Sequence, residues 1–412
     1  MSSIPVDVLA DILLRLPAKT LLRFKCVCKL WYNLIDSSDF VNRHVDQCNM
    51  HIIFKNPIVY MCDFVTFENP SNLEYPFKNW EDGGLYIIGL CRGLICFSIH
   101  DYPFTIFLYN PTTQTYKTLP FLPVTSTFDY PKGHRYTGFG YDHVSQDYRC
   151  VRIFIRQSDD GLFFRSQVMV YSLKFDVWKR GAYDLPYYMN SALIDYGYSV
   201  SLNRVVHWSV EGDRREPLPI VCLNFNDESF SYILLPDSHI EGLYHYKRAH
   251  IGVVDGCLCV ILNYYSYSDV WIIKEYGVAT SWTCLCRVPK QESYEDMRPI
   301  SGLKNRKGLL VYLTLVKVAY LDLETLEIMN VQPTGYKKLW GAYVFLENLL
   351  VFRDGEDVPR GTHQLRNRNS RLRKLSMIKT ERYSFCFWLT SCIVNHVSVA
   401  LIKNSVFVIL HK

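Results

Sequence analysis

Residues 4–40 read IPVDVLADILLRLPAKTLLRFKCVCKLWYNLIDSSDF, a stretch that is unusually dense in Leu, Ile, Val, Phe, Cys and Trp. So short a segment cannot bury that much apolar surface in a core of its own. The surplus apolar surface therefore predicts a partner that covers it.

The apolar positions of this stretch predict three short helices. The first helix has its apolar side chains at three- and four-residue steps, at Val8, Leu9, Ile12, Leu13 and Leu16. Pro17 ends that helix, because the residue before a proline disfavours the α region. We expect Thr20 to cap a second helix whose apolar positions extend to Ile35, and Ser38 or Asp39 to cap a third.

This pattern resembles the F-box, which we assign to residues 1–45. The matching residues are Ile4-Pro5, Asp7-Val8-Leu9, Ile12-Leu13, Arg15-Leu16-Pro17, Lys19, Leu21-Leu22-Arg23-Phe24, Val27-Cys28-Lys29, Trp31 and Leu34-Ile35. The resemblance implies that the helices bind a Skp-type adaptor and, through it, the cullin and RING subunits of a ubiquitin ligase. The residues expected to bind the adaptor are Ile4, Pro5, Val8, Leu9, Ile12, Leu16, Pro17, Leu21, Leu22, Val27, Cys28, Trp31, Leu34 and Ile35.

Two other interpretations of the helices stay open. They could form an ordinary helical cap on the domain that follows. They could also be a helix-turn-helix DNA reader, with Arg23, Lys25 and Lys29 facing phosphate. A recognition helix needs polar side chains that reach base edges, whereas the second helix is mostly apolar. The sequence therefore favours a protein partner.

The composition indicates a globular protein. Of 412 residues, 49% are hydrophobic and 21% charged, and the net charge of +5 argues against nucleic acid as the partner. The N-terminus shows no secretory signal pattern, so we expect the 14 cysteines to be free thiols in the cytoplasm and/or the nucleus. No spacing typical of a zinc site occurs, and we expect no metal and no cofactor.

One phrase recurs between residue 50 and about residue 352: an apolar strand, a second strand, a polar turn, and a third strand that often opens on an aromatic residue. Its five copies cover residues 93–120, 151–186, 205–236, 257–289 and 308–333. The residues that open the third strands are Tyr116, Trp178, Phe230, Trp282 and Ile328. Their spacing of about 50 residues is typical of a kelch-type propeller.

We therefore expect an all-β propeller over residues 50–352, with six blades. The remaining segments, 51–67 and 342–352, would combine into the sixth blade and close the ring, which removes exposed strand edges. Trp178 and Trp282 should be buried equivalents in successive blades. Two stacked β-sandwiches are the alternative architecture.

The repeats also resemble the plant F-box-associated interaction domain. The matching phrases are RGLICF (92–97), LYNPTTQTYKTLP (108–120), GFGYDHVSQDYRCVRI (138–153), VYSLKFDVWK (170–179), IGVVDGCLCV (251–260), DVWIIKEYGVATSWT (269–283) and YLDLE (320–324). The resemblance is closest to plant F-box proteins that restrain defence signalling, and pollen self-incompatibility F-box proteins share the architecture. It implies a substrate-recognition subunit of an SCF-type E3 ubiquitin ligase, whose propeller holds the target for ubiquitination and proteasomal degradation.

The sequence offers little support for catalysis, and we expect no catalytic residues. Gly138-Phe139-Gly140 predicts a strand-end turn, His207 a histidine packed in a strand, and Asp142-His143 a solvated turn. In place of chemistry, such a receptor acts by proximity. The alternative function is a kelch-type interaction scaffold without a role in a ligase.

We expect the target protein to bind loops of the propeller, since binding residues concentrate on loops held by a rigid scaffold. Aromatic and Arg side chains are the usual energetic centres of interfaces. The candidate residues are Tyr102, Phe104, Arg214, Arg215, Tyr244, Tyr246, Arg248, Tyr264, Tyr265 and Tyr267.

The C-terminal part departs from the family pattern. We expect a basic linker over residues 353–382 and a hydrophobic tail over 383–412. Residues 383–402 lack formal charge and are long enough to span a bilayer, but they contain Ser, Thr, Asn and His. A membrane anchor is therefore the disfavoured interpretation of a tail whose structure the sequence leaves open.

Overall fold

The computed structural model describes residues 5–352, apart from a set of short gaps. The gaps are residues 57, 65, 68–69, 74, 76–84, 100–104, 123–133, 158–163, 182–198, 210–218, 237–247, 292–293, 303–307, 315–316 and 332–338. The chain divides into two units, Met1–Gly355 and Glu356–Lys412. The described residues end at 352, so the expected linker (353–382) and tail (383–412) lie outside them.

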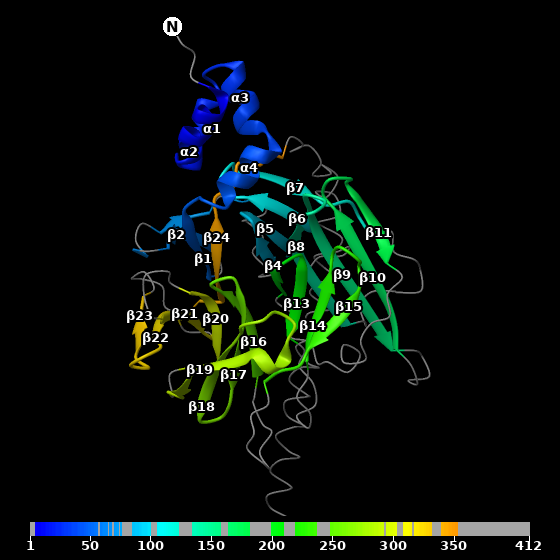
Figure 1. Cartoon of the computed structure of the whole chain (residues 1–412). Coiled ribbons are helices and arrows are strands. Elements are labelled where there is room, and N and C mark those ends of the chain that lie inside the picture. The colour runs from blue at the N-terminus through cyan, green and yellow to red at the C-terminus, as the bar shows by residue number, and fades with distance from the viewer. Residues whose placement is uncertain are drawn as a thin grey trace, which may run out of the picture. The chain divides into compact units, whose positions relative to one another are not determined.

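The chain begins with four helices, not three (Figure 1). They are α1 (Val6–Leu14), α2 (Ala18–Phe24), α3 (Lys29–Asp36) and α4 (Ser38–Val45). The expected second helix is broken before Cys28, whose backbone is extended at φ −161° and ψ 167°. Cys and β-branched Val are weak helix formers, and the turn at Cys26 and Val27 tightens to hydrogen bonds three residues back.

The expected helix caps are also corrected. Thr20 lies inside α2, which starts directly after Pro17, so its hydroxyl does not cap the helix. The N-cap of α4 is Ser37 instead of Ser38 or Asp39. Its hydroxyl oxygen accepts a hydrogen bond from the Phe40 N–H at 3.3 Å, because the backbone is still extended at Ser37 and turns helical only afterwards.

The remaining described chain forms six four-stranded antiparallel sheets, the blades of a propeller. Blade 2 consists of β4 (Leu85–Cys91), β5 (Leu94–Ile99), β6 (Ile106–Asn110) and β7 (Thr115–Thr118). Blade 3 consists of β8 (His134–Asp142), β9 (Asp147–Gln157), β10 (Phe164–Ser172) and β11 (Val177–Gly181). Blade 4 consists of β12 (Ser199–Leu202), β13 (Val205–Ser209), β14 (Ile220–Asn224) and β15 (Phe230–Ile233).

Blades 5 and 6 complete this series of consecutive strands. Blade 5 consists of β16 (Arg248–Val254), β17 (Cys257–Asn263), β18 (Tyr267–Ile273) and β19 (Trp282–Pro289), with the short 3₁₀ helix η2 (Ala279–Ser281) before β19. Blade 6 consists of β20 (Met297–Gly302), β21 (Gly308–Leu313), β22 (Lys317–Asp322) and β23 (Ile328–Asn330). Each copy of the sequence phrase supplies the outer three strands of a blade, and the first strand precedes the copy.

Blade 1 joins the two ends of the described chain and confirms the predicted sixth blade. It consists of β24 (Gly341–Leu346), β1 (Met50–Asn56), β2 (Ile58–Asp63) and β3 (Ser71–Asn72). β24 pairs antiparallel with β1, from Met50 opposite Leu346 to Lys55 opposite Gly341. The ring is thus closed by strands about 290 residues apart in sequence, and β1 has a partner on both sides.

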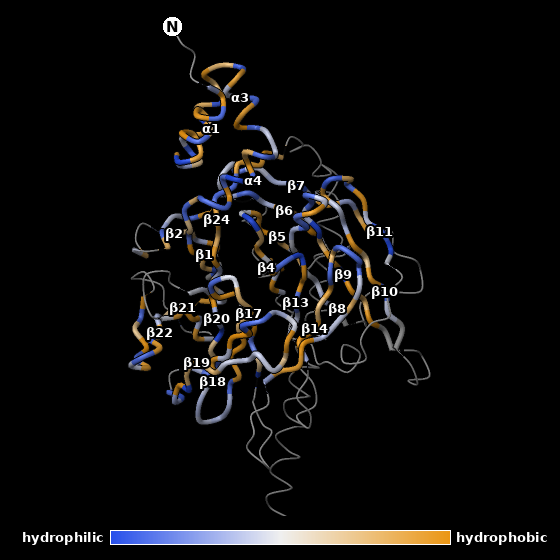
Figure 2. The backbone as a smooth tube through the Cα atoms, viewed as in Figure 1, coloured by the Kyte–Doolittle hydropathy of each residue, from blue (hydrophilic) through white to orange (hydrophobic). Residues whose placement is uncertain are grey.

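The core lies between neighbouring blades, where the hydrophobic residues of the strands gather (Figure 2). Trp178 and Trp282 are both buried, on the outermost strands β11 and β19. The indole N–H of Trp178 donates to the Pro120 carbonyl at 2.8 Å, and that of Trp282 donates to the Leu234 carbonyl at 2.9 Å. Each indole therefore joins its blade to the end of the preceding one. The expectation of successive blades is wrong, since blade 4 stands between them.

Strand direction sorts the connections onto two faces of the ring. In blade 2 the β4–β5 turn at Arg92-Gly93 lies at one end, where Arg92 pairs with Asp46 just after α4. We call this end of every blade the F-box face. The connections from second to third strand, and from one blade to the next, leave from the opposite end, which we call the far face.

Candidate functional site

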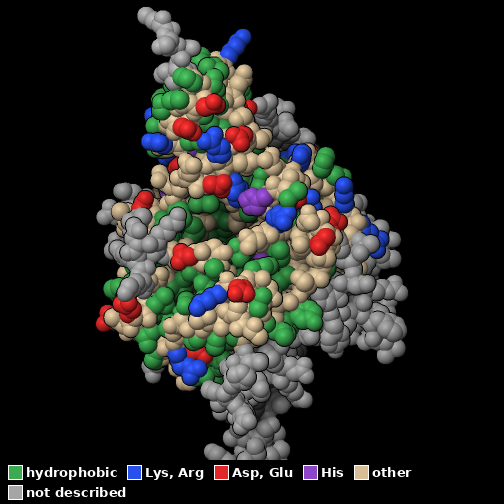
Figure 3. Space-filling view, in the orientation of Figure 1, with side chains coloured by type: hydrophobic (Ala, Val, Ile, Leu, Met, Phe, Trp, Pro, Cys, Tyr) green, Lys and Arg blue, Asp and Glu red, His purple; other side chains and the backbone are tan. Residues whose placement is uncertain are grey.

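Five aliphatic side chains of the helical region face solvent. Their exposed fractions are 47% for Val6, 49% for Val8, 50% for Ile12, 59% for Val27 and 51% for Leu30. Hydrophobic side chains are visible over these helices in the space-filling view (Figure 3). Large apolar groups concentrated on so small a unit indicate a surface that another protein covers. We call these five residues the exposed apolar set.

The residues expected to bind the adaptor fall into three groups. Those exposed are Pro5, Val8, Ile12, Pro17, Val27 and Cys28. Those partly buried are Leu16, Leu22, Trp31 and Leu34. Those buried in the helical core are Leu9, Leu21 and Ile35, while Ile4 lies outside the described residues. The exposed and partly buried side chains are the ones that offer surface to a partner.

Two members of the exposed apolar set, Val6 and Leu30, are absent from the residues expected to bind the adaptor. Val6 lies in the first turn of α1, and Leu30 lies at the start of α3. Helical spacing could not have identified Val6, because steps of two residues to Val8 and six to Ile12 place it on another side of α1. Leu30 could not be assigned in this way, because the break before α3 changes the phase of the helix.

The core of the helical region contains one residue from the other end of the described chain. Its buried residues from the helices are Leu9, Leu13, Leu14, Ala18, Leu21, Ile35 and Phe40. The eighth member is Leu349, which is 1% exposed and follows β24. Sequence patterns give no sign of this contact, since nothing local relates Leu349 to the helices.

The segment 347–352, which we call the strap, also makes polar contacts at the base of the helices. The carboxylate of Glu347 accepts hydrogen bonds from the Ala18 N–H at 3.2 Å and from His51 at 3.4 Å. The Cys48 thiol donates to the Glu347 carbonyl at 3.2 Å. Burial raises the pKa of Glu347, but the bonds from His51 and Ala18 lower it by more, so the group stays ionised at neutral pH.

The strap continues into blades 2 and 3. The Asn348 amide donates to the Arg92 carbonyl at 2.5 Å and to the Tyr148 hydroxyl at 2.9 Å, and the Asn110 amide donates to the Asn348 carbonyl at 2.9 Å. A Cβ at Gly93 would lie 2.5 Å from Asn348, so only glycine lets the strap pass. The strap therefore ties the helices, the closing strand and the neighbouring blades together.

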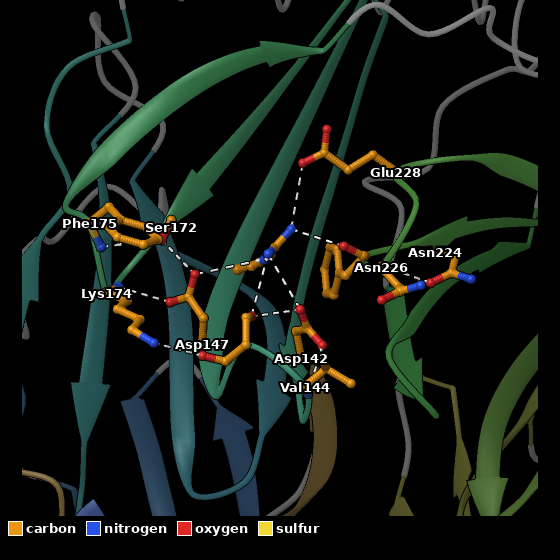
Figure 4. Close-up of polar contacts among 12 residues, drawn as sticks. Asp142, Val144, Asp147, Ser172, Lys174, Phe175, Asn224, Asn226 and Glu228 are labelled. Atoms are coloured by element: carbon orange, nitrogen blue, oxygen red, sulfur yellow. Dashed lines mark hydrogen bonds and ion pairs between the residues drawn. The ribbon is translucent and has the colours of Figure 1, made fainter.

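A buried polar cluster joins blades 3 and 4 on the F-box face (Figure 4). The Arg149 guanidinium donates to the Phe225 carbonyl at 3.0 Å and lies 3.4 Å from Asp142 and 3.6 Å from Glu228. Asp142 is 2% exposed, so the expectation of a solvated turn is wrong for Asp142, although His143 is exposed. Burial raises the pKa of Asp142, but hydrogen bonds and the Arg149 charge lower it by more. The contacts of Arg149 therefore hold blade 3 and blade 4 together at the F-box face.

The residues weighed for catalysis have structural surroundings. Gly138 and Gly140 lie within β8 instead of at a strand-end turn. Glycine is needed at position 138 because a Cβ there would lie 2.6 Å from Trp208 of the next blade. His207 is fully buried, as expected, and contacts the Val200 carbonyl at 3.1 Å and the Tyr276 hydroxyl at 2.7 Å. Burial lowers its pKa to about 4, so the ring is neutral at pH 7.

Four of the candidate target-binding residues are described. Arg248 pairs with Asp296 at 3.1 Å, and Tyr264 is buried with its ring 4.5 Å from that of Tyr267. Tyr265 is 64% exposed. The connection between β17 and β18 and the start of β16 both lie at the far face. The candidates outside the described residues are Tyr102, Phe104, Arg214, Arg215, Tyr244 and Tyr246.

The described part of the chain holds no group of three or more His, Cys, Asp or Glu side chains arranged for a metal ion. Its twelve cysteines are free. None of the helices in the described ranges is long and apolar enough to cross a membrane. Residues 383–402, for which an anchor was considered, lie outside those ranges.

Comparison with known proteins accounts for both parts of the described chain. Residues 1–43 match the F-box domain family, and residues 58–344 match the F-box associated beta propeller domain family. The chain is 32% identical to the F-box protein CPR1 of Arabidopsis thaliana, over 86% of this chain and 91% of that protein. It is 25% identical to the Arabidopsis thaliana F-box/kelch-repeat protein At3g23880, over 75% of this chain and 87% of that protein.

Proposed function

Because the chain belongs to the family of F-box proteins with an F-box-associated beta-propeller domain, we propose that it is the substrate-recognition subunit of an SCF-type E3 ubiquitin ligase. Its helices bind a Skp-type adaptor, which connects to the cullin and RING subunits. Its propeller binds the target protein and holds it near the ubiquitin-charged partner. The chain itself contributes position rather than covalent chemistry.

The observation that carries this proposal is the exposed apolar set. Val8 and Ile12 on α1 lie one helical turn apart, and Val27 lies in the break between α2 and α3. A specific interface of about 1,600 Å² would cover such a set together with the partly buried Leu16 and Trp31. The interface is supported indirectly by the helical core, in which Leu9, Leu21 and Ile35 pack and so position the exposed side chains.

Co-purification with the adaptor tests the proposal. Ile12→Asp and Val27→Asp each place an unpaired carboxylate in the contact, and each should weaken adaptor binding at least about tenfold. Both sites are half exposed or more, so the free protein should melt as the wild type does. The matched control is Val144→Asp, at a 68% exposed position of the β8–β9 turn, which should bind the adaptor normally.

The same experiment separates the two candidate functions. A wild-type chain that does not bind a Skp-type adaptor would leave the kelch-type scaffold as the better description. Normal adaptor binding by Ile12→Asp and Val27→Asp would remove the exposed apolar set as the contact. The double variant Leu16→Ala, Pro17→Ala should also weaken adaptor binding, because it removes apolar contact area at the edge of the same surface.

A role in plant defence is the finer part of the proposal. It rests on the sequence resemblance to F-box proteins that restrain defence signalling. Such a receptor would keep a defence activator scarce, so loss of the chain should raise basal expression of defence genes. Transcript measurements in a plant that lacks the chain test this, and unchanged basal transcripts would remove the defence role while leaving the ligase role standing.

A further inference from the structure

Lys55 is a buried cation at the far-face end of β1. Its side chain is 8% exposed, and its ammonium donates to the Leu85 carbonyl and lies 5.2 Å from the Tyr86 ring centroid and 5.6 Å from that of Trp340. No carboxylate of the described residues pairs with it. Aromatic faces attract a cation but leave its charge uncompensated, so an anion would be favoured beside it.

Arg298, on β20 of blade 6, is a second cation that none of the described carboxylates pairs with. Its Nε is buried and makes no hydrogen bond, and none of the described acidic side chains pairs with its guanidinium. Its charge acts on His250 of blade 5 and on Tyr343 of blade 1, which places it between those blades. A guanidinium in that position can take a carboxylate with two parallel hydrogen bonds.

These cations form one arc on the far face. The inner strand β20 packs beside β16 on one side and β24 on the other. Arg248 lies at the start of β16 with its side chain 32% exposed, and it pairs with Asp296 at 3.1 Å. Lys55 lies opposite Gly341 in the ladder with β24. We call Arg248, Arg298 and Lys55 the basic arc.

Aromatic side chains border the basic arc. Trp340 is 46% exposed, and Tyr86 is half-buried at the start of β4. Trp, Tyr and Arg are the residue types that most often carry the binding energy of protein interfaces. The arc thus combines two cations that no described carboxylate pairs with, Arg298 and Lys55, with apolar contact area. It lies on the face opposite the one that carries the helices.

We propose that the basic arc binds an acidic segment of the target protein, with Arg298 and Lys55 taking carboxylate side chains and Trp340 and Tyr86 packing against apolar side chains of the same segment. The proposal rests on the proposed function, since it names the chemistry of the target that the propeller receives. Arg248 adds attraction while staying paired with Asp296. The far face leaves the adaptor contact free, so both partners can bind at once.

Fluorescence anisotropy with a labelled peptide of alternating Glu and Tyr tests the proposal on the full chain bound to its adaptor. The wild type should bind this peptide at least about tenfold more tightly than peptides of alternating Gln and Tyr or Lys and Tyr. Arg298→Gln and Lys55→Met should each weaken binding about tenfold. The matched controls, Arg180→Gln and Lys179→Met on the exposed strand β11, should not change it.

The outcomes separate the basic arc from the ligase role. Equal affinity for the Glu and Gln peptides, or unchanged affinity of both arc variants, overturns the proposal. Competition by a mixed-sequence oligonucleotide as strong as by the Glu peptide also overturns it, since the site would then select any polyanion. Adaptor binding is measured on the same samples: its loss in the wild type refutes the ligase role, whereas its presence without peptide binding refutes only the arc.

Discussion

Lys55 holds a charge where the folded chain disfavours it. Burial lowers its pKa from 10.5 to about 8, so at neutral pH the ammonium is still protonated at a cost in folding free energy. The folded protein binds that proton less readily than the unfolded chain. The cost of the buried charge is therefore present in full below about pH 8. The free energy of unfolding should rise between about pH 8 and pH 10.5, where the unfolded chain binds the proton that the folded protein has lost. A destabilising buried cation of this kind is typical of a binding site.

Replacing Lys55 with Met should raise the free energy of unfolding at pH 7 by about 2 kcal/mol, because the desolvated charge is removed and the apolar stem is kept. The variant should also lose the rise in stability between about pH 8 and pH 10.5. Urea unfolding across this pH range measures both effects. Lys179→Met, at an exposed position, should stay within about 0.5 kcal/mol of the wild type. A destabilised Lys55→Met would show that the aromatic contacts outweigh desolvation.

Residue-level roles were the least predictable from the sequence. Lys55 is a single Lys in a short strand, and its surroundings come from β4 and from Trp340. The pair Asp142-His143 was predicted to form a solvated turn, yet Asp142 pairs with Arg149 in the polar cluster that joins blades 3 and 4. Such assignments depend on which blades meet, which local patterns do not contain.

Among the elements, the outermost strands connect each blade to the one before it. Trp178 and Trp282 do this through indole hydrogen bonds to backbone carbonyls and through buried ring surface. The sequence predicted these strands, because an aromatic residue after a polar turn recurs at a steady spacing. The first strands of blades 2 to 6 carry no such phrase. In β8, for example, Gly138 is required by the approach of Trp208, and glycines weaken a strand pattern.

Trp178→Ala should lower the free energy of unfolding by about 3–5 kcal/mol, since it leaves a large cavity between blades 2 and 3 and an unpaired Pro120 carbonyl. Trp282→Ala should have a comparable effect between blades 4 and 5. The control is Phe175→Ala, three residues before Trp178, where the ring is 66% exposed and the change should be within about 0.5 kcal/mol. Chemical denaturation checks the series, and equal effects at Phe175 and Trp178 would contradict it.

The strap is the element that completes the helical core. Leu349→Ala should destabilise the helices by about 2–5 kcal/mol and weaken adaptor binding, because the exposed apolar set rests on that core. Hydrogen exchange should show faster exchange in α1 to α3, with the blades unchanged. Val351→Ala, two residues further on and 37% exposed, is the control. Unchanged exchange in the helices of Leu349→Ala would separate the strap from the F-box.

For the whole molecule, closure by β24 should make the ring one cooperative unit, because β24 pairs with β1 from the other end of the described chain. The sequence predicted this closure from two unassigned apolar segments at the ends of the repeats, because a propeller without it would leave open strand edges. It could not predict that the chain after β24 continues into the helical core. That contact joins residues 329 positions apart, as in the hydrogen bond between Ala18 and Glu347.

A chain that ends at Trp340 should therefore lose stability throughout the ring, since β1 and β4 lose their neighbour and the inner edge is exposed. Differential scanning calorimetry should show one transition at a lower temperature, or no cooperative transition. A chain that ends at Gly355 keeps every described strand and is the control. Normal melting of blades 3 to 5 in the shorter chain would show that the blades fold independently of closure.

Because Leu349 belongs to the helical core, that core can be completed only late in the synthesis of the chain. The helices leave the ribosome first, but their core waits for a residue made about 300 positions later, which is roughly 15–60 seconds at ordinary elongation rates. During that interval α1 to α3 should be incompletely packed and exposed to chaperones. The adaptor-binding helices would thus mature only after the propeller has closed, so an unfinished receptor would rarely enter a ligase.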